Sequence, residues 1–418
     1  MSLLTGLRRL SRALPIDQRL LHRLRRLAGA GFAFSAYVRH GLNRKPQAPR
    51  PGPVCVVGFH GSVLGIGEAA RAFSAALRAA GAEVVDWDIS ARFGHDVRLG
   101  GGYPTEPPAD AASMVIYLNP RELVQLVGMA GAAPFRDRFC VGAWAWELEE
   151  VPKGWTAALR YVDEAWACSR FVADAVSRIA SPDLTVRVQP HPLPPSTAKP
   201  DRVAFGLAED AVVVLTAFDI KSGFVRKNPI GAVRAFRKAA VPGAVMICKV
   251  SGAAGAPELF AQLQDEIGTA GDVRLMEDWL TGAEMAALVA GADIVLSLHR
   301  SEGFGLLPAQ AMLAGKAVVA TGWSGNLDYM DGDDSVLVDY KLIPVEDPQG
   351  LYDQGRWADP DIDQAATKLA VLMTDAATRR ALGAKAAVRV AERLDPVRLG
   401  KQARGWLGDE PEAADKGV

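Results

Sequence analysis

The chain has 418 residues, of which 49% are hydrophobic and 23% are charged, and its formal net charge is −1. This composition is typical of a soluble globular protein, and the near-zero charge gives no indication of a nucleic-acid partner. The length predicts two domains of about 150 residues plus extensions, because single cores rarely grow beyond that size.

The first fifty residues differ from the rest of the chain in charge. They contain eleven Lys or Arg and one acid, Asp17. Leu3, Leu7, Leu10 and Leu14 fall on one helical face, which predicts a basic amphipathic segment. Such a segment either lies on an anionic membrane surface or packs on the protein itself or a partner. The proline-containing stretch at 44–53 then predicts a linker.

The cysteines and the apolar runs both favour a cytoplasmic protein. Cys55, Cys140, Cys168 and Cys248 stand singly in apolar runs without metal-ligand spacing, which predicts buried thiols in a reducing compartment. No apolar run approaches the roughly 18 residues that span a bilayer. We therefore expect a cytoplasmic location, with residues 1–45 able to attach the protein to the inner face of the membrane.

From Val54 onward, short β-branched runs alternate with helical patterns. The series is interrupted by the prolines around 190–195 and then begins again. Strand and helix in strict turn predict a parallel, doubly wound sheet, here twice, with a cleft between the two domains. The expected strands are 54–59, 82–88, 112–119, 138–146 and 164–169 in the first domain, and 211–218, 244–250, 273–276, 293–298 and 317–321 in the second.

Ligands of such sheets bind beyond the carboxyl ends of the strands, so the loops after strands are the candidate sites. The loop at 58–71 contains Gly65 and Gly67 before a helix that is expected to start near Glu68. Its "GIGEAA" matches the dinucleotide-binding fingerprint in form, with the acids of "DWD" (86–88) following. The first glycine comes seven residues after Gly58, too late for the tight turn of that fingerprint. A nicotinamide-dependent dehydrogenase is thus a minor alternative.

Two loops of the second domain carry charged residues after strands. Arg226 and Lys227 precede Asn228 and Pro229, an expected helix start, and two cations there suit a diphosphate leaving group. Glu302 follows the strand at 293–298 and is itself followed by Gly303 and Gly305, which allow backbone conformations that other residues avoid. A carboxylate is repelled by phosphate, so we expect it to bind hydroxyl groups. The loop at 321–330 adds Ser324 and Asn326.

The segment "SLHRSEGFGLLPAQAMLAGKAVVATGWSGNLDYM" resembles the donor-site signature of retaining, two-domain nucleotide-sugar glycosyltransferases, the GT-B type of glycosyltransferase family 4. "GIGEAAR", "FVRKNP" and "WELEEVP" resemble segments of bacterial members that build surface polysaccharides. The resemblance covers about residues 54–400. It implies an α/β GT-B fold with four parts: an extension (1–50), an acceptor domain (51–195), a nucleotide-sugar donor domain (196–390), and a C-terminal helix and tail that crosses back (391–418).

The resemblance also implies roles for single residues. Lys227 and Arg226 would hold the diphosphate, Glu302 would contact the transferred sugar, and Glu147 in "AWAWELEEVP" would orient the acceptor. Trp144 and Trp146 beside it either stack on sugar or pack in the core. Lys221 or Arg226 would replace an arginine that the family often has before the lysine. The remaining expected ligand contacts are Gly65, Gly67, Gly303, Phe304, Gly305, Leu306, Ser324 and Asn326.

One position departs from the family pattern. A second glutamate, eight residues after the first, binds the ribose in the family, and the corresponding residue here is Gln310. A carboxylate offers two hydrogen-bond acceptors, whereas the Gln310 amide offers one acceptor and one N–H group. Binding of the nucleotide sugar is therefore expected to be weaker by on the order of 1 kcal/mol.

The predicted enzyme is a retaining, metal-independent hexosyltransferase. It would use a UDP- or GDP-sugar, with a glycan or lipid-linked glycan as acceptor. Its rival is a non-catalytic sugar-nucleotide or glycan-binding protein disarmed at Gln310. "DWD" also has the spacing of a metal-binding motif, but it ends a strand in the first domain.

Overall fold

The computed structural model describes residues 45–409, and these fold as two compact units. Of the described residues, the first unit contains 45–192 and 394–409, and the second contains Leu193–Arg393. The predicted basic amphipathic segment lies outside the described residues apart from its last few positions. No helix among residues 45–409 has the length and apolar character needed to cross a membrane.

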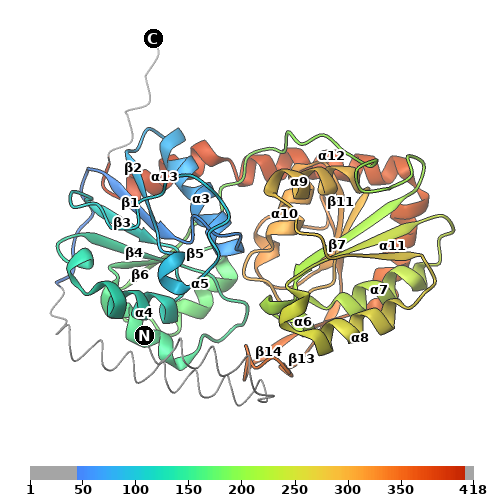
Figure 1. The fold of residues 1–418 in the computed structure, drawn as a ribbon, viewed down its shortest axis with the longest axis horizontal. Helices are drawn as coiled ribbons and strands as arrows, with labels where there is room; N and C mark the ends of the chain where they lie inside the picture. Colours follow the sequence, from blue (N-terminus) through green and yellow to red (C-terminus); the bar gives the residue numbers. More distant parts are fainter. Residues whose placement is uncertain (1–44, 410–418) are drawn as a thin grey trace, which may run out of the picture. The chain divides into compact units, whose positions relative to one another are not determined.

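The first unit contains a six-stranded sheet of order β2-β1-β3-β4-β5-β6, with every neighbouring pair parallel. Helices accompany it on both sides (Figure 1). The strands are β1 (Val54–Gly58), β2 (Val84–Asp88), β3 (Ser113–Ile116), β4 (Phe139–Trp144), β5 (Glu164–Ala167) and β6 (Thr185–Val188). The helices between them are α3 (Gly65–Ala79), α4 (Pro120–Ala130) and α5 (Arg170–Ser177), with a 3₁₀ segment at Lys153–Tyr161.

The last helix, α13 (Pro396–Trp406), completes this unit although it comes at the end of the described chain. Figure 1 shows it beside α3. Arg404 donates to the carbonyl of Ala80 at 2.8 Å, and a Cβ at Gly400 would lie 2.2 Å from the carbonyl oxygen of Ala76. The close approach of α13 to α3 therefore requires glycine at position 400.

The second unit has a six-stranded parallel sheet of order β12-β11-β10-β7-β8-β9. Its strands are β7 (Val213–Asp219), β8 (Val245–Ser251), β9 (Val273–Met276), β10 (Ile294–Ser297), β11 (Ala317–Thr321) and β12 (Val336–Val338). The central strands β7, β10 and β11 are largely buried on both faces, as expected for β-branched strands covered by helices. The helices are α6 (Phe224–Lys227), α7 (Pro229–Ala239), α8 (Pro257–Ile267), α9 (Gly282–Gly291), α10 (Leu306–Leu313), α11 (Ile362–Thr374) and α12 (Ala376–Arg393).

The strand order of the second sheet defines where a ligand is expected to bind. The chain runs outward from β7 through β8 to β9 and then returns to β10 on the other side of β7. Ligands of open parallel sheets bind beyond the carboxyl ends of the strands at this point of reversal. The loops after β7 and β10 meet there, and these are the loops that carry Lys227 and Glu302.

An antiparallel ribbon outside the parallel sheet was not expected from the sequence. It consists of β13 (Tyr340–Pro344) and β14 (Arg356–Pro360) and is joined by a loop at 345–355. The strands β6 and β12 were likewise not predicted, and α3 begins at Gly65 rather than near the expected Glu68.

Candidate functional site

The loop after β7 brings two cations to the carboxyl edge of the second sheet. Asn228 has a left-handed backbone (φ 51°) and begins α7 by accepting a hydrogen bond from the Gly231 amide at 3.2 Å. Its side-chain amide also donates to the carbonyl of Leu298 after β10, at 2.9 Å. Pro229 follows in the first turn, where its missing N–H costs nothing. Asn228 thus ties the two loops together directly beside Lys227.

Arg226 is a buried link between the same loops. Its side chain is 3% exposed and donates to the carbonyls of Ser301 (2.8 Å) and Ser222 (2.6 Å). Its own carbonyl accepts from the amide of Arg300 at 2.7 Å. The side chain of Lys227 is 23% exposed. Lys227 is therefore the more accessible of the two cations, whereas Arg226 is held within the protein.

Glu302 lies against both cations. Its carboxylate forms an ion pair with the ammonium of Lys227 and lies 3.2 Å from the Arg226 guanidinium. Burial by itself would raise the pKa of Glu302, but Lys227, Arg226 and His299 lower it to about 2. The carboxylate is thus ionised at neutral pH. We call Arg226, Lys227 and Glu302 the charge triad.

Ser324 and Asn326 hold the Glu302 loop from behind. The Ser324 hydroxyl accepts from the Glu302 amide at 2.8 Å, and the Glu302 carbonyl accepts from the Gly325 amide at 2.9 Å. The Asn326 side chain lies 3.1 Å from the ring of His299, and burial lowers the pKa of this histidine. Both residues are buried. These hydrogen bonds of Ser324 and Asn326 position the loop that carries Glu302.

The glycine stretch after Glu302 leads directly into α10. Gly305 has a left-handed backbone (φ 88°), and a Cβ there would lie 2.9 Å from the Tyr329 hydroxyl, which donates to the Gly305 carbonyl at 2.6 Å. Gly303 and Phe304 are buried, and Leu306 is the first residue of the helix. Gln310 follows one turn later and is half-buried. Residues four apart share a helix face, so Gln310 lies on the same face as Leu306.

The other predicted site residues are not part of the charge triad. Lys221 is exposed and packs against Gly255, where a Cβ would lie 2.2 Å from its Cε. Glu147, Gly65 and Gly67 belong to the first unit. Glu147 is half-buried and Gly65 is exposed. A Cβ at Gly67 would lie 2.5 Å from the Phe59 carbonyl oxygen, which is a packing reason for that glycine.

In the first unit, the contacts of Trp144 and of the two acids in "DWD" indicate structural roles. Trp144 is buried against the ring of Trp155, with ring centroids 5.8 Å apart, so it is a core residue. Asp86 pairs with Arg78 at 2.7 Å, and Asp88 accepts from the Ser90 hydroxyl at 2.6 Å. Among residues 45–409, no three His, Cys, Asp or Glu side chains group in a way that could hold a metal ion.

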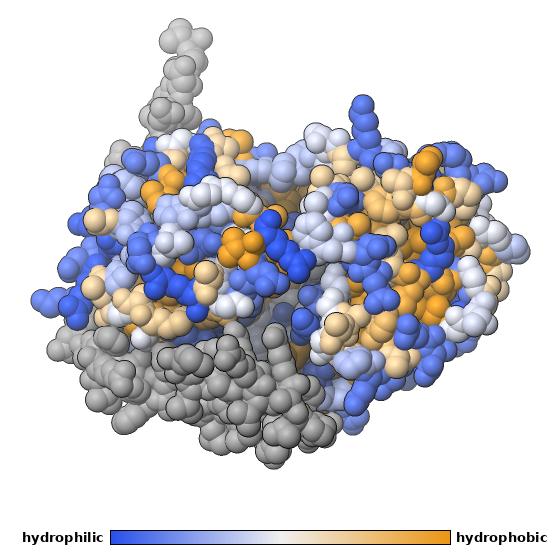
Figure 2. Space-filling view, in the orientation of Figure 1, coloured by the Kyte–Doolittle hydropathy of each residue, from blue (hydrophilic) through white to orange (hydrophobic). Residues whose placement is uncertain are grey.

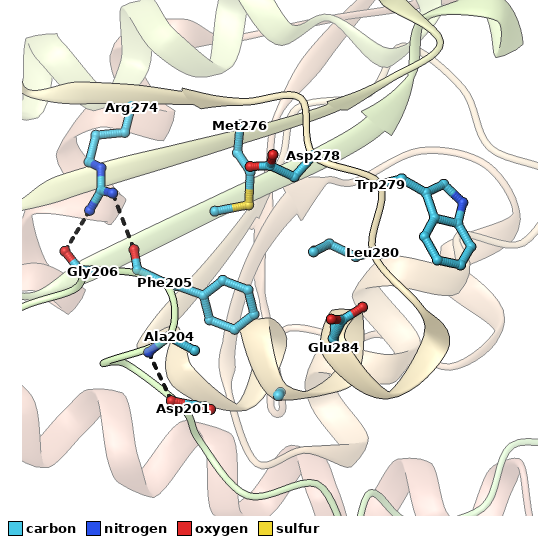
Figure 3. Close-up of a pocket in the computed structure, with 11 residues that line it drawn as sticks. Asp201, Ala204, Phe205, Gly206, Arg274, Met276, Asp278, Trp279, Leu280 and Glu284 are labelled. Atoms are coloured by element: carbon cyan, nitrogen blue, oxygen red, sulfur yellow. Dashed lines mark hydrogen bonds between the residues drawn. The ribbon is translucent and has the colours of Figure 1, made fainter.

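A pocket of about 570 Å³ lies at β9 and α9 of the second unit (Figure 3). Phe205 from the segment before β7 projects toward Met276 and Leu280 from the end of β9 and its connection to α9, and Arg274 donates to the carbonyls of Gly206 (2.7 Å) and Phe205 (3.2 Å). Trp279, on its rim, is 49% exposed. Figure 2 shows hydrophobic residues among hydrophilic ones on both units, so exposure of one such ring is ordinary. The pocket is instead characterised by its apolar wall and by the position of Trp279 just after β9, the edge strand of the sheet.

Two structural features near the pocket and α6 have no signal in the sequence. Phe205 comes from the segment before β7, which gave no motif, and it reaches the pocket only through the fold. The 345–355 loop likewise contacts the α6 helix from far along the chain: Gln349 accepts a hydrogen bond from the Phe224 amide. Neither residue had a signal in the sequence.

Three comparisons relate this chain to known proteins. Residues 230–356 match the family described as "Glycosyl transferases group 1". No curated protein matches the chain in sequence. The solved structure of Anabaena HepE in complex with UDP and glucose is similar with a TM-score of 0.61 at 14% identity, covering 85% of this chain and 99% of that one.

Two further structures have the same fold. Sucrose-phosphate synthase from Thermosynechococcus elongatus has a TM-score of 0.60 at 16% identity, over 85% of this chain and 98% of its own. A glycosyltransferase from Rickettsia africae has a TM-score of 0.60 at 10% identity, over 88% of this chain and 100% of its own. The chain therefore has the GT-B fold, confirming the predicted fold class, and carries a glycosyl transferases group 1 domain within its second unit.

Proposed function

We propose that this protein is a retaining glycosyltransferase of family 4 that moves a sugar from a UDP- or GDP-sugar to a glycan or lipid-linked glycan in bacterial surface polysaccharide synthesis. The observation that carries the proposal is the charge triad at the point where the second sheet reverses its strand order. Both the group 1 match and the UDP-sugar complexes of HepE support it.

Each member of the charge triad has a different role in binding the nucleotide sugar. Lys227 contacts the diphosphate, since it is the more exposed cation, while Arg226 keeps the loop in place. The amides from Gly303 to Leu306 and the start of α10 add further donors to the phosphate. Glu302, ionised and fixed, accepts hydrogen bonds from sugar hydroxyls, and Gln310 faces the ribose.

The pocket at β9 and α9 is the proposed subsite for the nucleotide base. Its aliphatic and aromatic residues suit a planar ring, and Asp278 on the rim offers acceptors for ring N–H groups. Met276 and Leu280 supply its apolar wall from the end of β9 and its connection to α9.

The reaction is driven by charge stabilisation. A nucleoside diphosphate is a good leaving group, so cations and amides at the developing charge supply much of the rate without a covalent nucleophile. The proposal includes independence of metal ions, because Lys227 and Arg226 supply the positive charge. If EDTA abolished activity and manganese restored it, this part would be wrong.

The acceptor and the membrane complete the proposal. Glu147 is the residue proposed to orient the acceptor, and Gly65 and Gly67 are proposed to bring backbone amides close to the donor. Residues 1–45 attach the cytoplasmic enzyme to an anionic membrane surface through their basic amphipathic pattern. A chain without residues 1–45 should lose binding to anionic vesicles and activity on a lipid-linked acceptor. If both were unchanged, the proposed attachment would be refuted.

The test of the donor site is a thermal-shift screen of UDP, GDP, ADP, dTDP and NAD. A nucleoside diphosphate present at 100 times its Kd should stabilise the folded state by about 2.7 kcal/mol. Stabilisation by NAD alone would instead support a nicotinamide-dependent dehydrogenase.

A further inference from the structure

The loop at 345–355 holds the side chains of Gln349 and Tyr352 in fixed positions. Asp347 is buried, and its carboxylate accepts hydrogen bonds from the amides of Gln349 (3.0 Å), Leu351 (2.7 Å) and Tyr352 (3.2 Å). A carboxylate that accepts three backbone N–H groups fixes the turn around it. The loop therefore has a defined shape of its own.

Gln349 uses both ends of its amide on the loop that precedes Lys227. Its oxygen accepts from the Phe224 amide at 2.6 Å, and its nitrogen donates to the Ile220 carbonyl at 2.9 Å. These partners lie 125 and 129 residues earlier in the sequence. Ile220 and Phe224 are both buried, so the two backbone groups depend on partners within the protein.

The bond to the Phe224 amide has a particular meaning for α6. This helix spans only Phe224–Lys227 and carries both cations of the triad. The first amides of a helix have no partner within it, and a side chain at the N-cap position usually supplies one. The N-cap residue here is Gly223, which has no side chain and a backbone φ of 105°. Gln349 supplies the missing cap from the distant loop.

The same loop and ribbon also contact Arg226 and the loop that carries Glu302. The Arg226 guanidinium lies over the ring of Tyr352, 5.9 Å from its centroid. The Ala358 amide of β14 donates to the carbonyl of Arg300 at 2.8 Å, and the Arg300 guanidinium pairs with Asp359 at 3.0 Å. The ribbon thus contacts the loop after β7 through Gln349 and the loop after β10 through β14.

We infer that Gln349 is a positioning residue for diphosphate binding: it caps α6 from the 345–355 loop and so fixes Arg226 and Lys227 for the phosphates. The inference rests on the proposed function. Without the amide, the Phe224 N–H and the Ile220 carbonyl lose their partners, and other conformations of the loop become populated. The apparent affinity falls by the fraction of molecules that keep the competent conformation.

The test compares Gln349→Ala with Gln364→Ala. Gln364 on α11 is a matched control because its amide also accepts a backbone N–H, from Asp339 at 2.8 Å, and donates to the side chain of Asp339 at 2.7 Å. Calorimetry measures the Kd of UDP and GDP, and ligand-observed NMR measures the Kd of uridine and guanosine. Gln349→Ala should weaken diphosphate binding about tenfold and leave nucleoside binding unchanged. Gln364→Ala should change neither.

A second variant and a second measurement guard against a general loss of fold. Gln349→Met keeps the side-chain length without hydrogen bonds and should show the same selective loss. Hydrogen exchange of the peptide covering 220–227 should be faster in both Gln349 variants and unchanged in Gln364→Ala.

Three outcomes would overturn the inference: unchanged diphosphate affinity, an equal loss for nucleosides, or the same loss in Gln364→Ala. If the wild-type chain itself bound no nucleoside diphosphate, the proposed function would fail. Wild-type binding that both Gln349 variants retain would contradict only the role of Gln349.

Discussion

Lys227 and Glu302 form an ion pair across two loops although 75 residues separate them in the sequence. The pair joins the end of α6 to the start of the glycine stretch before α10. The proposed phosphate-binding cation and the proposed sugar-binding carboxylate therefore lie in direct contact.

Lys227→Ala should lower turnover with a nucleotide sugar about 100-fold, because it removes the exposed cation that stabilises the leaving diphosphate. Binding of inorganic pyrophosphate should weaken as well. Lys238→Ala is the control, since Lys238 pairs with Asp363 on the surface and is not in the site. Equal turnover in Lys227→Ala and Lys238→Ala would remove Lys227 from the mechanism.

Glu302→Gln should destabilise the folded protein by about 3 kcal/mol, because it leaves Arg226 and Lys227 without their buried counter-charge. The same change should retain or tighten diphosphate binding while turnover is lost. Urea unfolding and calorimetry with UDP and GDP measure the two effects. If Glu302→Gln weakened diphosphate binding strongly, the carboxylate would not be a competitor for these cations.

The stability difference between wild type and Glu302→Gln should depend on pH in a defined window. The pKa of Glu302 is lowered in the folded state from 4.5 to about 2. Its stabilising contribution is therefore fully present above about pH 4.5 and is lost as the pH falls toward 2. Burial lowers the pKa of His299 and Glu302 partly offsets this, so acid destabilisation through His299 is greater in Glu302→Gln and cannot shrink the difference between pH 8 and 6. A difference that already shrinks between pH 8 and 6 would point to another group.

Gln310→Glu should tighten donor binding about fivefold to tenfold, because a carboxylate accepts from both ribose hydroxyls. Titration with the nucleoside diphosphate found in the screen measures the change. Gln264→Glu, at an exposed position on α8, is the control for an added negative charge on the same unit. Unchanged affinity in Gln310→Glu would show that the ribose lies elsewhere.

Trp279→Ala should weaken binding of both the nucleoside and its diphosphate by about fivefold, because a ring that stacks on a base is worth about 1–3 kcal/mol. Pyrophosphate binding should not change, in contrast to Lys227→Ala. Val203→Ala is the control, since Val203 is also exposed and lies near the pocket in sequence but does not line it. A loss confined to pyrophosphate would contradict the base subsite.

The sequence predicted the features that depend on local pattern. The strand runs, the Asn228-Pro229 helix start and the two loops with Lys227 and Glu302 all lie where the residues indicated. Strand order then brings the loops after β7 and β10 together without any further signal in either loop.

Features that depend on distant contacts were not predictable. The cap that Gln349 gives to α6 comes from 125 residues away, and Gly223 alone looks like an ordinary loop glycine. The ribbon strand Tyr340–Pro344 pairs antiparallel with Arg356–Pro360, so it interrupts the strand and helix alternation. Trp144 ends the strand β4, where a site residue could lie, but it is buried against Trp155 and is part of the core.

The most direct test of the central claim is turnover with a panel of UDP-, GDP- and dTDP-sugars, comparing wild type with Lys227→Ala. Nucleoside diphosphate release and NMR of the anomeric proton in the product are the two measurements. We predict release and transfer from one class of donor with retained anomeric configuration, reduced about 100-fold in Lys227→Ala. Binding of a nucleotide sugar without any release or transfer would contradict the claim and would instead identify a non-catalytic sugar-nucleotide binding protein.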